Sequence, residues 1–184
     1  MLPSWFTVDT PLPTGPMRIA VTAQGVLAAA FTPQEHAALP PGPELRDPAA
    51  DRRAVAVRTR FDEYFAGRRR DLDLPIDWAL TNGVQRTVLQ ALQAQVGFGR
   101  TVSYGELADV SGAFEDGREQ RALAARVVGS IIGSNPLSLL VPSHRVVAAG
   151  GLGGFGGGAE GMAVKRWLLT LEGCLEPTLD WSAF

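Results

Sequence analysis

The chain has 184 residues, enough for one sizeable domain or two small ones, and it is 46% hydrophobic and 20% charged. This composition excludes intrinsically disordered and fibrous classes. The formal net charge of -2 excludes a globally basic protein, so any contact with nucleic acid must come from a local basic surface. Cys174 is the only cysteine, which rules out an intrachain disulfide and favours a reducing compartment.

Several expectations about location and cofactors follow from what the sequence lacks. The N-terminal residues show no charged head followed by an apolar run, so we expect no signal peptide. No run approaches the roughly 18 apolar residues of a membrane helix. We therefore expect a cytoplasmic monomer without membrane contact. No His, Cys and Asp cluster has ligand spacing, so we expect neither a metal ion nor an organic cofactor.

Residues 1–78 are predicted to form a small N-terminal α/β domain. Two apolar runs, residues 17–22 and 26–31, flank a short turn and predict a β-hairpin. A proline-rich stretch then predicts a surface loop at residues 39–43. His36 lies between these signals without a second candidate ligand, so we expect a surface or structural role for it.

The second half of this N-terminal part predicts one helix and one more strand. Large apolar residues recur at spacings of four, three and one, which predicts a helix over residues 54–66; they are Val57, Phe61, Tyr64 and Phe65. Residues 72–76 alternate leucine or isoleucine with polar positions, which predicts a half-buried strand.

Residues 79–184 are predicted to form a helical C-terminal domain, and two capping signals mark where its first helices begin. In each signal a small polar residue precedes a glutamine or glutamate by three positions, so that the two side chains can cap each other's backbone N–H. The first helix is expected to end at Gly97 and the second at Gly112. The two pairs are Asn82 with Gln85 and Ser103 with Glu106.

A third helix is predicted from Arg118 to Ile132, and Asn135-Pro136 ends it because the residue before proline disfavours helical geometry. Projected at about 100° per residue, its large apolar residues share one face and its small and basic residues the other half. We expect the apolar face in the core and the basic half outward. The apolar face is Leu123, Val127 and Ile131; the other half is Arg118, Arg121, Ala122, Ala125 and Arg126.

The second and third of these helices fit a helix-turn-helix. Small side chains beside arginines let a helix approach DNA closely while the positive charge meets phosphate. Acidic Glu115, Asp116 and Glu119 dilute that positive field, so a solvated helix face without a partner stays open as the alternative.

The segment around Pro142-Ser143-His144-Arg145 carries the most specific signal, because it is one of five motifs that occur in a fixed order. The motifs are TVSYGELA at 101–108, ARVVG at 125–129, SNP at 134–136, VPSHRVV at 141–147 and, after a glycine-rich loop, KRWLLTLEG at 165–173. Together they resemble the C-terminal domain of the DNA alkylguanine alkyltransferases, the methylated-DNA–protein-cysteine methyltransferases. The resemblance implies an α+β fold: a small, ribonuclease H-like N-terminal α/β domain followed by a helical, winged helix-turn-helix-like DNA-binding domain.

The resemblance also implies roles for single residues. Arg126 resembles the arginine that inserts through the minor groove and takes the place of a flipped nucleotide, and Tyr104 resembles the tyrosine that rotates the target phosphate. Asn135 resembles the asparagine that braces the turn before the active site. In active members the histidine that matches His144 acts through water as the base for a cysteine, and the glutamate that matches Glu172 orients that histidine. The implied substrate pocket comprises Tyr104, Val146, Phe155, Gly156 and Gly157.

Ser143 occupies the position of the reactive cysteine in this resemblance. A cysteine thiol titrates near 8.5 and is easily activated, whereas a serine hydroxyl is far less acidic. We therefore predict a DNA repair protein that binds duplex DNA and flips O-alkylated guanine without alkyl transfer, flagging the damage for nucleotide excision repair proteins. Other departures are a longer, acidic segment over 113–120 and Phe155-Gly156 where many members have tyrosine and a hydroxyl residue.

Three alternatives compete with this prediction: an altered active enzyme, a hydrolase, and Cys174 as a displaced nucleophile. An active methyltransferase carrying a deliberate cysteine-to-serine change would have the same sequence, so whether the natural protein is an enzyme stays open. A Ser143–His144–Glu172 hydrolase is disfavoured, because neighbours in an extended segment point to opposite sides and no Gly-x-Ser-x-Gly elbow is present. Cys174 has no neighbouring histidine or arginine and is predicted to be an unreactive thiol.

Overall fold

An antiparallel sheet of three strands opens the computed structural model, which describes residues 2–115, 118–156 and 158–177. The strands are β1 (Ser4–Val8), β2 (Met17–Val21) and β3 (Val26–Ala30), in the order β1-β2-β3. The predicted hairpin is confirmed as β2 and β3, whereas β1 was not predicted. Its turn needs a glycine, because Gly25 has a φ of 145° and a Cβ there would lie 2.2 Å from the carbonyl oxygen of Pro75.

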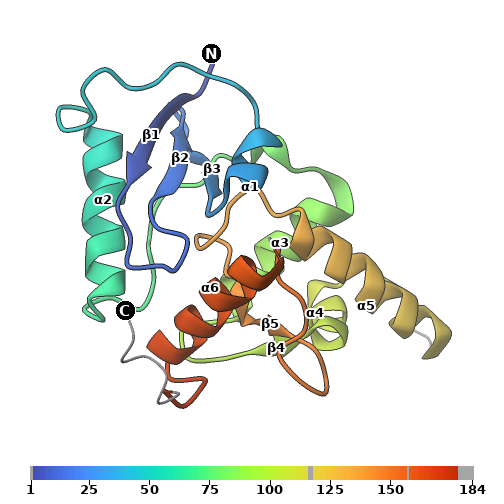
Figure 1. Cartoon of the computed structure of the whole chain (residues 1–184). Coiled ribbons are helices and arrows are strands. Elements are labelled where there is room, and N and C mark those ends of the chain that lie inside the picture. The colour runs from blue at the N-terminus through green and yellow to red at the C-terminus, as the bar shows by residue number, and fades with distance from the viewer. Residues whose placement is uncertain (1, 116–117, 157, 178–184) are drawn as a thin grey trace.

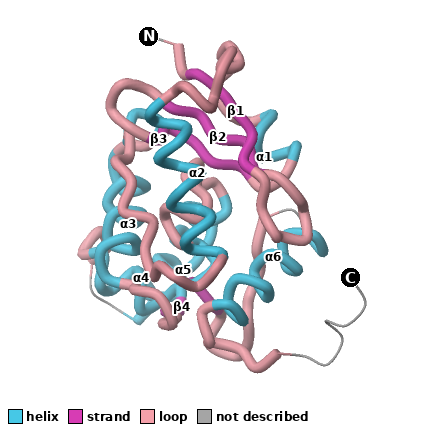
Figure 2. The backbone as a smooth tube through the Cα atoms, turned by 90° about the vertical axis from the view of Figure 1, so that its left-hand side faces the viewer, coloured by secondary structure: helices cyan, strands magenta, loops and turns pink. Residues whose placement is uncertain are grey.

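Two helices follow the sheet. α1 (Pro33–Ala37) is short, and α2 (Arg52–Phe65) confirms the predicted helix and lies alongside the sheet (Figures 1 and 2). The Asp51 side chain caps α2 by accepting from the backbone N–H groups of Arg53 and Ala54. The buried face of α2 is Ala54, Val57, Phe61 and Tyr64.

The strand predicted over residues 72–76 is wrong. Only a single bridge forms there, between Val26 and Ile76. Asp73 adopts a φ of 43°, which is left-handed, and Pro75 has no N–H to donate to a ladder. Leu72 is still buried, so the alternation served packing and not strand pairing.

The C-terminal part is built from helices and two very short parallel strands. Its elements are η1 (Trp78–Leu80), α3 (Gly83–Gln95), β4 (Val102–Ser103), α4 (Tyr104–Ser111), α5 (Arg118–Gly133), η2 (Ser143–Arg145), β5 (Val146–Val147) and α6 (Gly158–Leu171). β4 pairs with β5, which brings the start of α4 beside the segment that follows Ser143. The far end of α5 projects away from the body of the molecule (Figure 1).

One of the two predicted capping boxes forms. In α4 the Ser103 and Glu106 side chains each accept from the other's backbone N–H, at 3.2 and 2.8 Å. The box predicted at α3 is wrong, since the Asn82 side chain makes no capping hydrogen bond. Gly83 begins α3 with a φ of 47°, and the Gln85 amide donates to Ser134 at the end of α5 instead.

The predicted apolar face of α5 is partly wrong. Leu123 is 61% exposed, and the residues that reach the core are Ala124, Val128, Ile131 and Ile132. They repeat at intervals of four, three and one, as one helical face does. This face packs toward α4 and α3, so the true face is rotated from the predicted one and leaves Leu123 in water.

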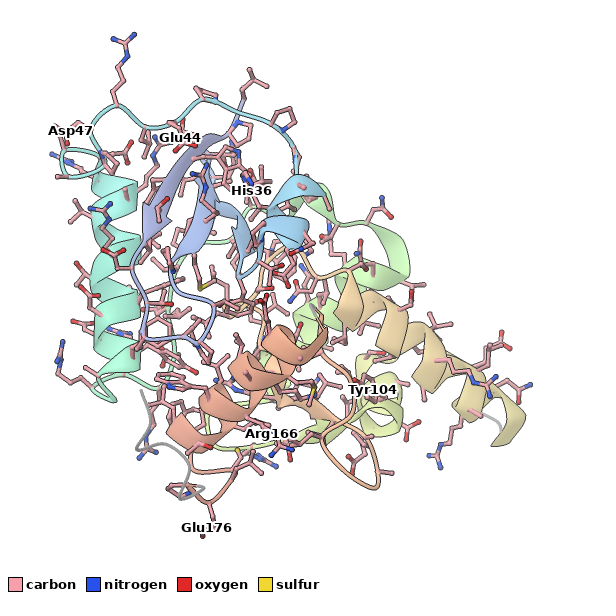
Figure 3. The ribbon with its side chains drawn as sticks, viewed as in Figure 1. His36, Glu44, Asp47, Tyr104, Arg166 and Glu176 are labelled. Atoms are coloured by element: carbon pink, nitrogen blue, oxygen red, sulfur yellow. The ribbon has the colours of Figure 1, made fainter. Side chains whose placement is uncertain are left out.

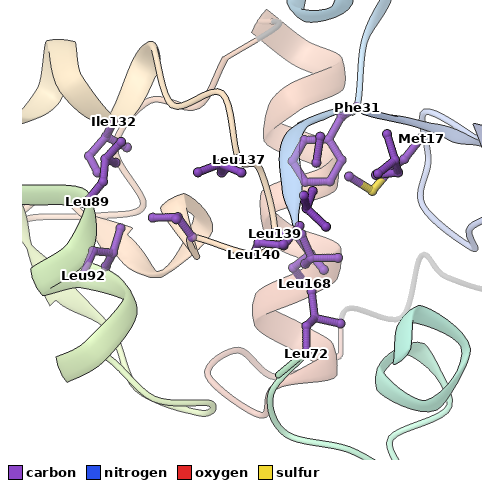
Figure 4. Close-up of a cluster of buried hydrophobic side chains, with 14 of the residues drawn as sticks. Met17, Phe31, Leu72, Leu89, Leu92, Ile132, Leu137, Leu139, Leu140 and Leu168 are labelled. Atoms are coloured by element: carbon purple, nitrogen blue, oxygen red, sulfur yellow. The ribbon is translucent and has the colours of Figure 1, made fainter. Parts of the chain in front are cut away.

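The larger of two hydrophobic clusters joins the sheet to the helices, and a small second one lies at Trp5, Ala20, Leu27 and Ala28. Side chains from the N-terminal part, such as Met17, Phe31 and Leu72, lie in one cluster with Leu89 of α3 and Leu168 of α6 (Figure 4). The division into domains at residue 78 stays a prediction, since the core runs across it. In the part of the chain that the structure describes, no helix is long and apolar enough to cross a membrane.

Candidate functional site

Ser143 is the first residue of η2, and the side chain of Asn135 braces the turn that leads into it. The Asn135 side-chain nitrogen donates to Ser143 Oγ at 2.8 Å and to the Val141 carbonyl at 3.0 Å. Its oxygen accepts from the backbone N–H of Leu137 at 3.0 Å. Leu139, within this turn, has a φ of 73°, a strained conformation that its burial in the core holds in place. Asn135 therefore links both ends of the turn that leads into Ser143.

Ser143 and His144 do not lie in the extended segment that we predicted. They belong to the 3-10 helix η2, because the turn feeds directly into the helical residues. Their side chains nevertheless bond to different partners: Ser143 Oγ to Asn135, and His144 Nε2 to Glu172 Oε1 at 2.9 Å. The described contacts include no Ser143–His144 hydrogen bond, the one that a hydrolase would use.

Glu172, at the end of α6, is the centre of a buried network behind Ser143. Besides His144 it accepts from Arg145 Nε at 2.9 Å and from the backbone N–H of Gly99 at 3.2 Å. The Tyr64 hydroxyl of α2 donates to its Oε1 at 2.5 Å. Our sequence reasoning missed two members: Arg145 was quoted only within the motif, and Tyr64 matched the apolar face of α2 and was assigned to packing.

The electrostatics of this network fix the protonation states. Burial would raise the pKa of Glu172, but hydrogen bonds from His144 and Arg145 outweigh it and hold that pKa well below its ordinary value. Burial lowers the pKa of His144, against the opposing effect of Glu172. The lowered pKa favours the neutral imidazole, in which Nε2–H donates to Glu172 and Nδ1 is an acceptor. Nδ1 is buried and has no hydrogen-bond partner among the described residues.

A pocket of about 230 Å³ opens in front of Ser143. Three of the five predicted pocket residues line it: Tyr104, Phe155 and Gly156. Val146 does not, because its side chain points into the core, and Gly157 lies outside the described residues. The full lining is Glu35, Tyr104, Gly129, Ile132, Gly133, Asn135, Ser138, Ser143, Gly154, Phe155 and Gly156.

The glycine-rich loop closes one side of this pocket, and two polar side chains hold it. Tyr104 donates to the carbonyl oxygen of Gly154 at 3.3 Å. A Cβ at Gly153 would lie 3.2 Å from the Tyr104 ring, so a glycine lets the loop come this close. The buried Lys165 ammonium donates to the carbonyl oxygens of Gly154 at 3.2 Å and Val146 at 2.6 Å, and burial lowers its pKa to about 8. Sequence reasoning quoted Lys165 only as the first residue of the last motif and gave it no role, although the one lysine of the chain in an apolar helix was a signal.

Four of the six predicted DNA-binding residues, Arg121, Ala122, Ala125 and Arg126, are described on α5 with exposed or half-buried side chains. Arg126 and Ala122 are exposed and Ala125 is half-buried. Arg121 is exposed but forms an ion pair with Asp109 of α4 at 3.0 Å. Tyr104 lies where α4 begins, between α5 and the loop before α6 (Figure 3). The side chains of Arg118 and Glu119 lie outside the described residues, as does Asp116.

Two minor candidates give little chemistry. Burial, together with the nearby Glu172 charge, raises the pKa of the Cys174 thiol, which makes the thiolate less accessible. His36 packs edge-on against Trp5, with ring centroids 4.7 Å apart. Across the described ranges, no group of three or more His, Cys, Asp or Glu side chains is arranged to hold a metal ion.

Comparison with known proteins decides the family. The family model described as "6-O-methylguanine DNA methyltransferase, DNA binding domain" matches residues 83–174. The chain belongs to this methyltransferase family. Its fold is the mixed α+β fold of the family's structures, with an N-terminal sheet and a helical C-terminal DNA-binding part. Both the predicted family and the predicted fold class are confirmed.

Similar members of the methyltransferase family carry two kinds of name. A Thermus thermophilus protein named "DNA base-flipping protein" is 41% identical over 90% of this chain and 98% of its own length. A Mycobacterium bovis "methylated-DNA--protein-cysteine methyltransferase" is 37% identical over 90% of each chain. A crystal structure of Mycobacterium tuberculosis OGT in complex with DNA has a TM-score of 0.72 at 34% identity, over 93% of each chain.

Proposed function

We propose that this protein binds duplex DNA, flips an O6-alkylated guanine into the pocket beside Ser143, and holds it there without alkyl transfer. The observation that supports the proposal is the Ser143 hydroxyl, at the position that resembles the family's nucleophile, hydrogen-bonded to Asn135 and next to the His144–Glu172 pair. The similarity to a relative named as a base-flipping protein supports the same function.

The chemistry of residue 143 explains the absence of transfer. Displacement at an alkyl carbon needs a nucleophile that is anionic near neutral pH, which a thiol provides when a base takes its proton. His144 is neutral and its Nδ1 is free to accept a proton. A serine hydroxyl is too weak an acid for a neutral imidazole to deprotonate appreciably. Asn135, which donates to Ser143 Oγ, does not close so large a gap in acidity.

Two residues match the family's flipping device, one on the outer surface of α5 and one in the pocket lining. Arg126 is exposed on α5, free to enter the minor groove and fill the space of the extruded base. Tyr104 lines the pocket, where it would meet the rotated phosphate and the entering base. Extruding a base costs a few kcal/mol, and less for a mispaired or damaged one. This difference would favour alkylated guanine before the pocket makes any contact.

A stable complex with the lesion would mark the site for other proteins. Without transfer the damage persists, so removal falls to a separate excision pathway, and nucleotide excision repair proteins are the proposed partners. We propose a cytoplasmic monomer as the working form.

An active methyltransferase altered at residue 143 is the second candidate, and one observation favours it. The histidine–glutamate pair and the bracing asparagine are fully formed behind Ser143, as alkyl transfer would require. Ser143→Cys restores the thiol, so transfer by this variant would show that the rest of the site still supports the reaction.

A competition titration at fixed salt tests the proposal, with labelled duplexes that carry guanine or O6-methylguanine. We expect a preference for the lesion of tenfold or more, about 1.4 kcal/mol. Equal affinity for both duplexes would refute lesion recognition. In parallel, DNA with a labelled methyl group should leave no label on the wild-type protein and about one label per molecule on Ser143→Cys. Label on the wild type would refute the absence of transfer.

A further inference from the structure

A carboxylate from the N-terminal part of the chain forms one wall of the pocket. Glu35 belongs to α1, yet it lines the same pocket as Ser143 and Asn135. Its Oε2 accepts from the backbone N–H groups of Phe31 at 2.6 Å and Thr32 at 3.3 Å. These two hydrogen bonds hold the carboxyl group in place. The Thr32 hydroxyl in turn accepts from the Glu35 N–H at 3.2 Å, which completes the capping box.

The second carboxyl oxygen of Glu35 has no such partner. No described residue donates a hydrogen bond to Oε1, and none of the described ion pairs includes Glu35. Oε1 lies beside the glycine-rich loop, because a Cβ at Gly156 would be 3.4 Å from it. Among the described lining residues Glu35 is the only one with a charged side chain.

The helix cap explains the position of Glu35 Oε2 but not the presence of a second, charged oxygen in the pocket. A capping box needs one carboxyl oxygen, and Oε2 makes both of the backbone contacts. Burial raises the pKa of Glu35 against the opposing effect of these N–H groups, so keeping the charge here costs free energy. Glutamine could cap the helix equally well without that cost.

We propose that Glu35 determines which O6-alkyl groups the pocket accepts: it disfavours adducts that carry a negative charge and favours adducts that end in a hydrogen-bond donor. The inference rests on the proposed function, because it names the substrate class of the same site. A second carboxylate brought into this pocket meets the like charge of Glu35 at short range, where the partial burial of Glu35 weakens dielectric screening. A terminal hydroxyl can instead donate a hydrogen bond to Oε1, which accepts none from the described residues.

The test measures the affinity of the full-length protein for four duplexes by fluorescence anisotropy at fixed ionic strength. The target base is guanine, O6-methylguanine, O6-(2-hydroxyethyl)guanine or O6-carboxymethylguanine. We expect the wild type to bind the carboxymethyl duplex at least tenfold more weakly than the hydroxyethyl duplex. Glu35→Gln should remove most of this difference by strengthening carboxymethyl binding relative to hydroxyethyl binding.

Two matched variants separate this effect from general charge and from folding of α1. Glu160→Gln removes a negative charge from an exposed position outside the pocket and should leave the discrimination unchanged. Thr32→Ala weakens the α1 cap but keeps the carboxylate, so it should also keep the discrimination. Loss of discrimination in Thr32→Ala would show that α1 geometry, not charge, is responsible.

The outcomes distinguish the inference from the function on which it rests. If the wild type prefers O6-methylguanine over guanine but Glu35→Gln leaves the carboxymethyl and hydroxyethyl affinities unchanged, the inference is wrong and the proposed function stands. If no modified duplex is preferred over guanine, the proposed function fails, and the inference fails with it.

Discussion

The two sides of Ser143 differ in how their polar groups are satisfied. Behind it, Glu172 is surrounded by donors from Tyr64, His144 and Arg145 in a region with almost no solvent exposure. In front of it, Glu35 Oε1 and the Arg126 guanidinium have no described partner in the chain. Behind Ser143 the charged groups pair within the chain and only His144 Nδ1 lacks a described partner, whereas in front of it charged groups are left for a ligand.

From this contrast we expect substitutions behind Ser143 to change the free energy of unfolding, and substitutions in front of it to change the free energy of DNA binding. Removing a member of a closed, buried network leaves its neighbours unsatisfied, so the loss appears in the stability of the fold. Removing an exposed group in front costs the free protein almost nothing, so the loss appears only when DNA binds. Four substitutions test the contrast, from the largest expected effect to the smallest.

Glu172→Gln should have the largest effect, a loss of about 3–5 kcal/mol in the free energy of unfolding at neutral pH, because Arg145 then stays buried without its counter-charge. The folded-state pKa of Glu172 lies below the unfolded value of about 4.3, so its contribution is present above that pH and disappears as pH falls through the folded value. Urea unfolding across this range should show wild type and variant converging in acid. A gap that persists there would mean that packing, not charge, is lost.

Arg126→Ala should weaken DNA binding without changing the stability of the fold. We expect a loss of tenfold or more in affinity for the O6-methylguanine duplex, with an unchanged unfolding midpoint, and a smaller loss for Arg118→Ala. Binding should also weaken with added salt in proportion to a small number of phosphate contacts. Equal losses in the two arginine variants would indicate a general basic face instead of an inserted residue.

Tyr64→Phe sharpens the comparison at the rear, since it removes only the hydroxyl that donates to Glu172. The remaining donors keep Glu172 ionised, so we expect a stability loss of about 1 kcal/mol and unchanged lesion affinity. Thermal unfolding and the anisotropy titration measure the two quantities on one sample. A change in lesion affinity without a stability loss would place Tyr64 among the recognition residues.

Leu123→Ala should have the smallest effect on stability, no more than about 0.5 kcal/mol, because Leu123 is 61% exposed on α5. Ile132→Ala, on the buried face of the same helix, should cost about 2 kcal/mol or more. A large loss from Leu123→Ala would restore the helix orientation that we first predicted from the sequence.

Local signals in the sequence predicted local structure well. The hairpin of β2 and β3 and the box at Ser103 and Glu106 formed as expected, because each depends on residues within a few positions of one another. The same spacing at Thr32 and Glu35 is a capping signal that would have located α1. The prediction for residues 72–76 failed because alternation reports which residues are buried, not whether a neighbouring strand is there to pair.

The resemblance to the family located Ser143, Asn135, His144 and Glu172, and the geometry brings them together. It gave nothing for Tyr64 or Glu35, because both approach the site from more than a hundred residues away along the chain. Contacts of that kind depend on how the sheet docks against the helices, which no periodicity or spacing encodes. The rotation of α5 is a similar case, since its neighbours decide which face is buried.

The large hydrophobic cluster that joins sheet and helices makes the pocket depend on both parts of the chain. Met17 of β2 and Leu168 of α6 belong to one cluster, so exposing either part to water removes burial from the other. We expect one cooperative unfolding transition, in which sheet and pocket are lost together. A destabilising substitution at Met17 would then lower the population of molecules with a formed pocket as much as an equally destabilising substitution beside Ser143.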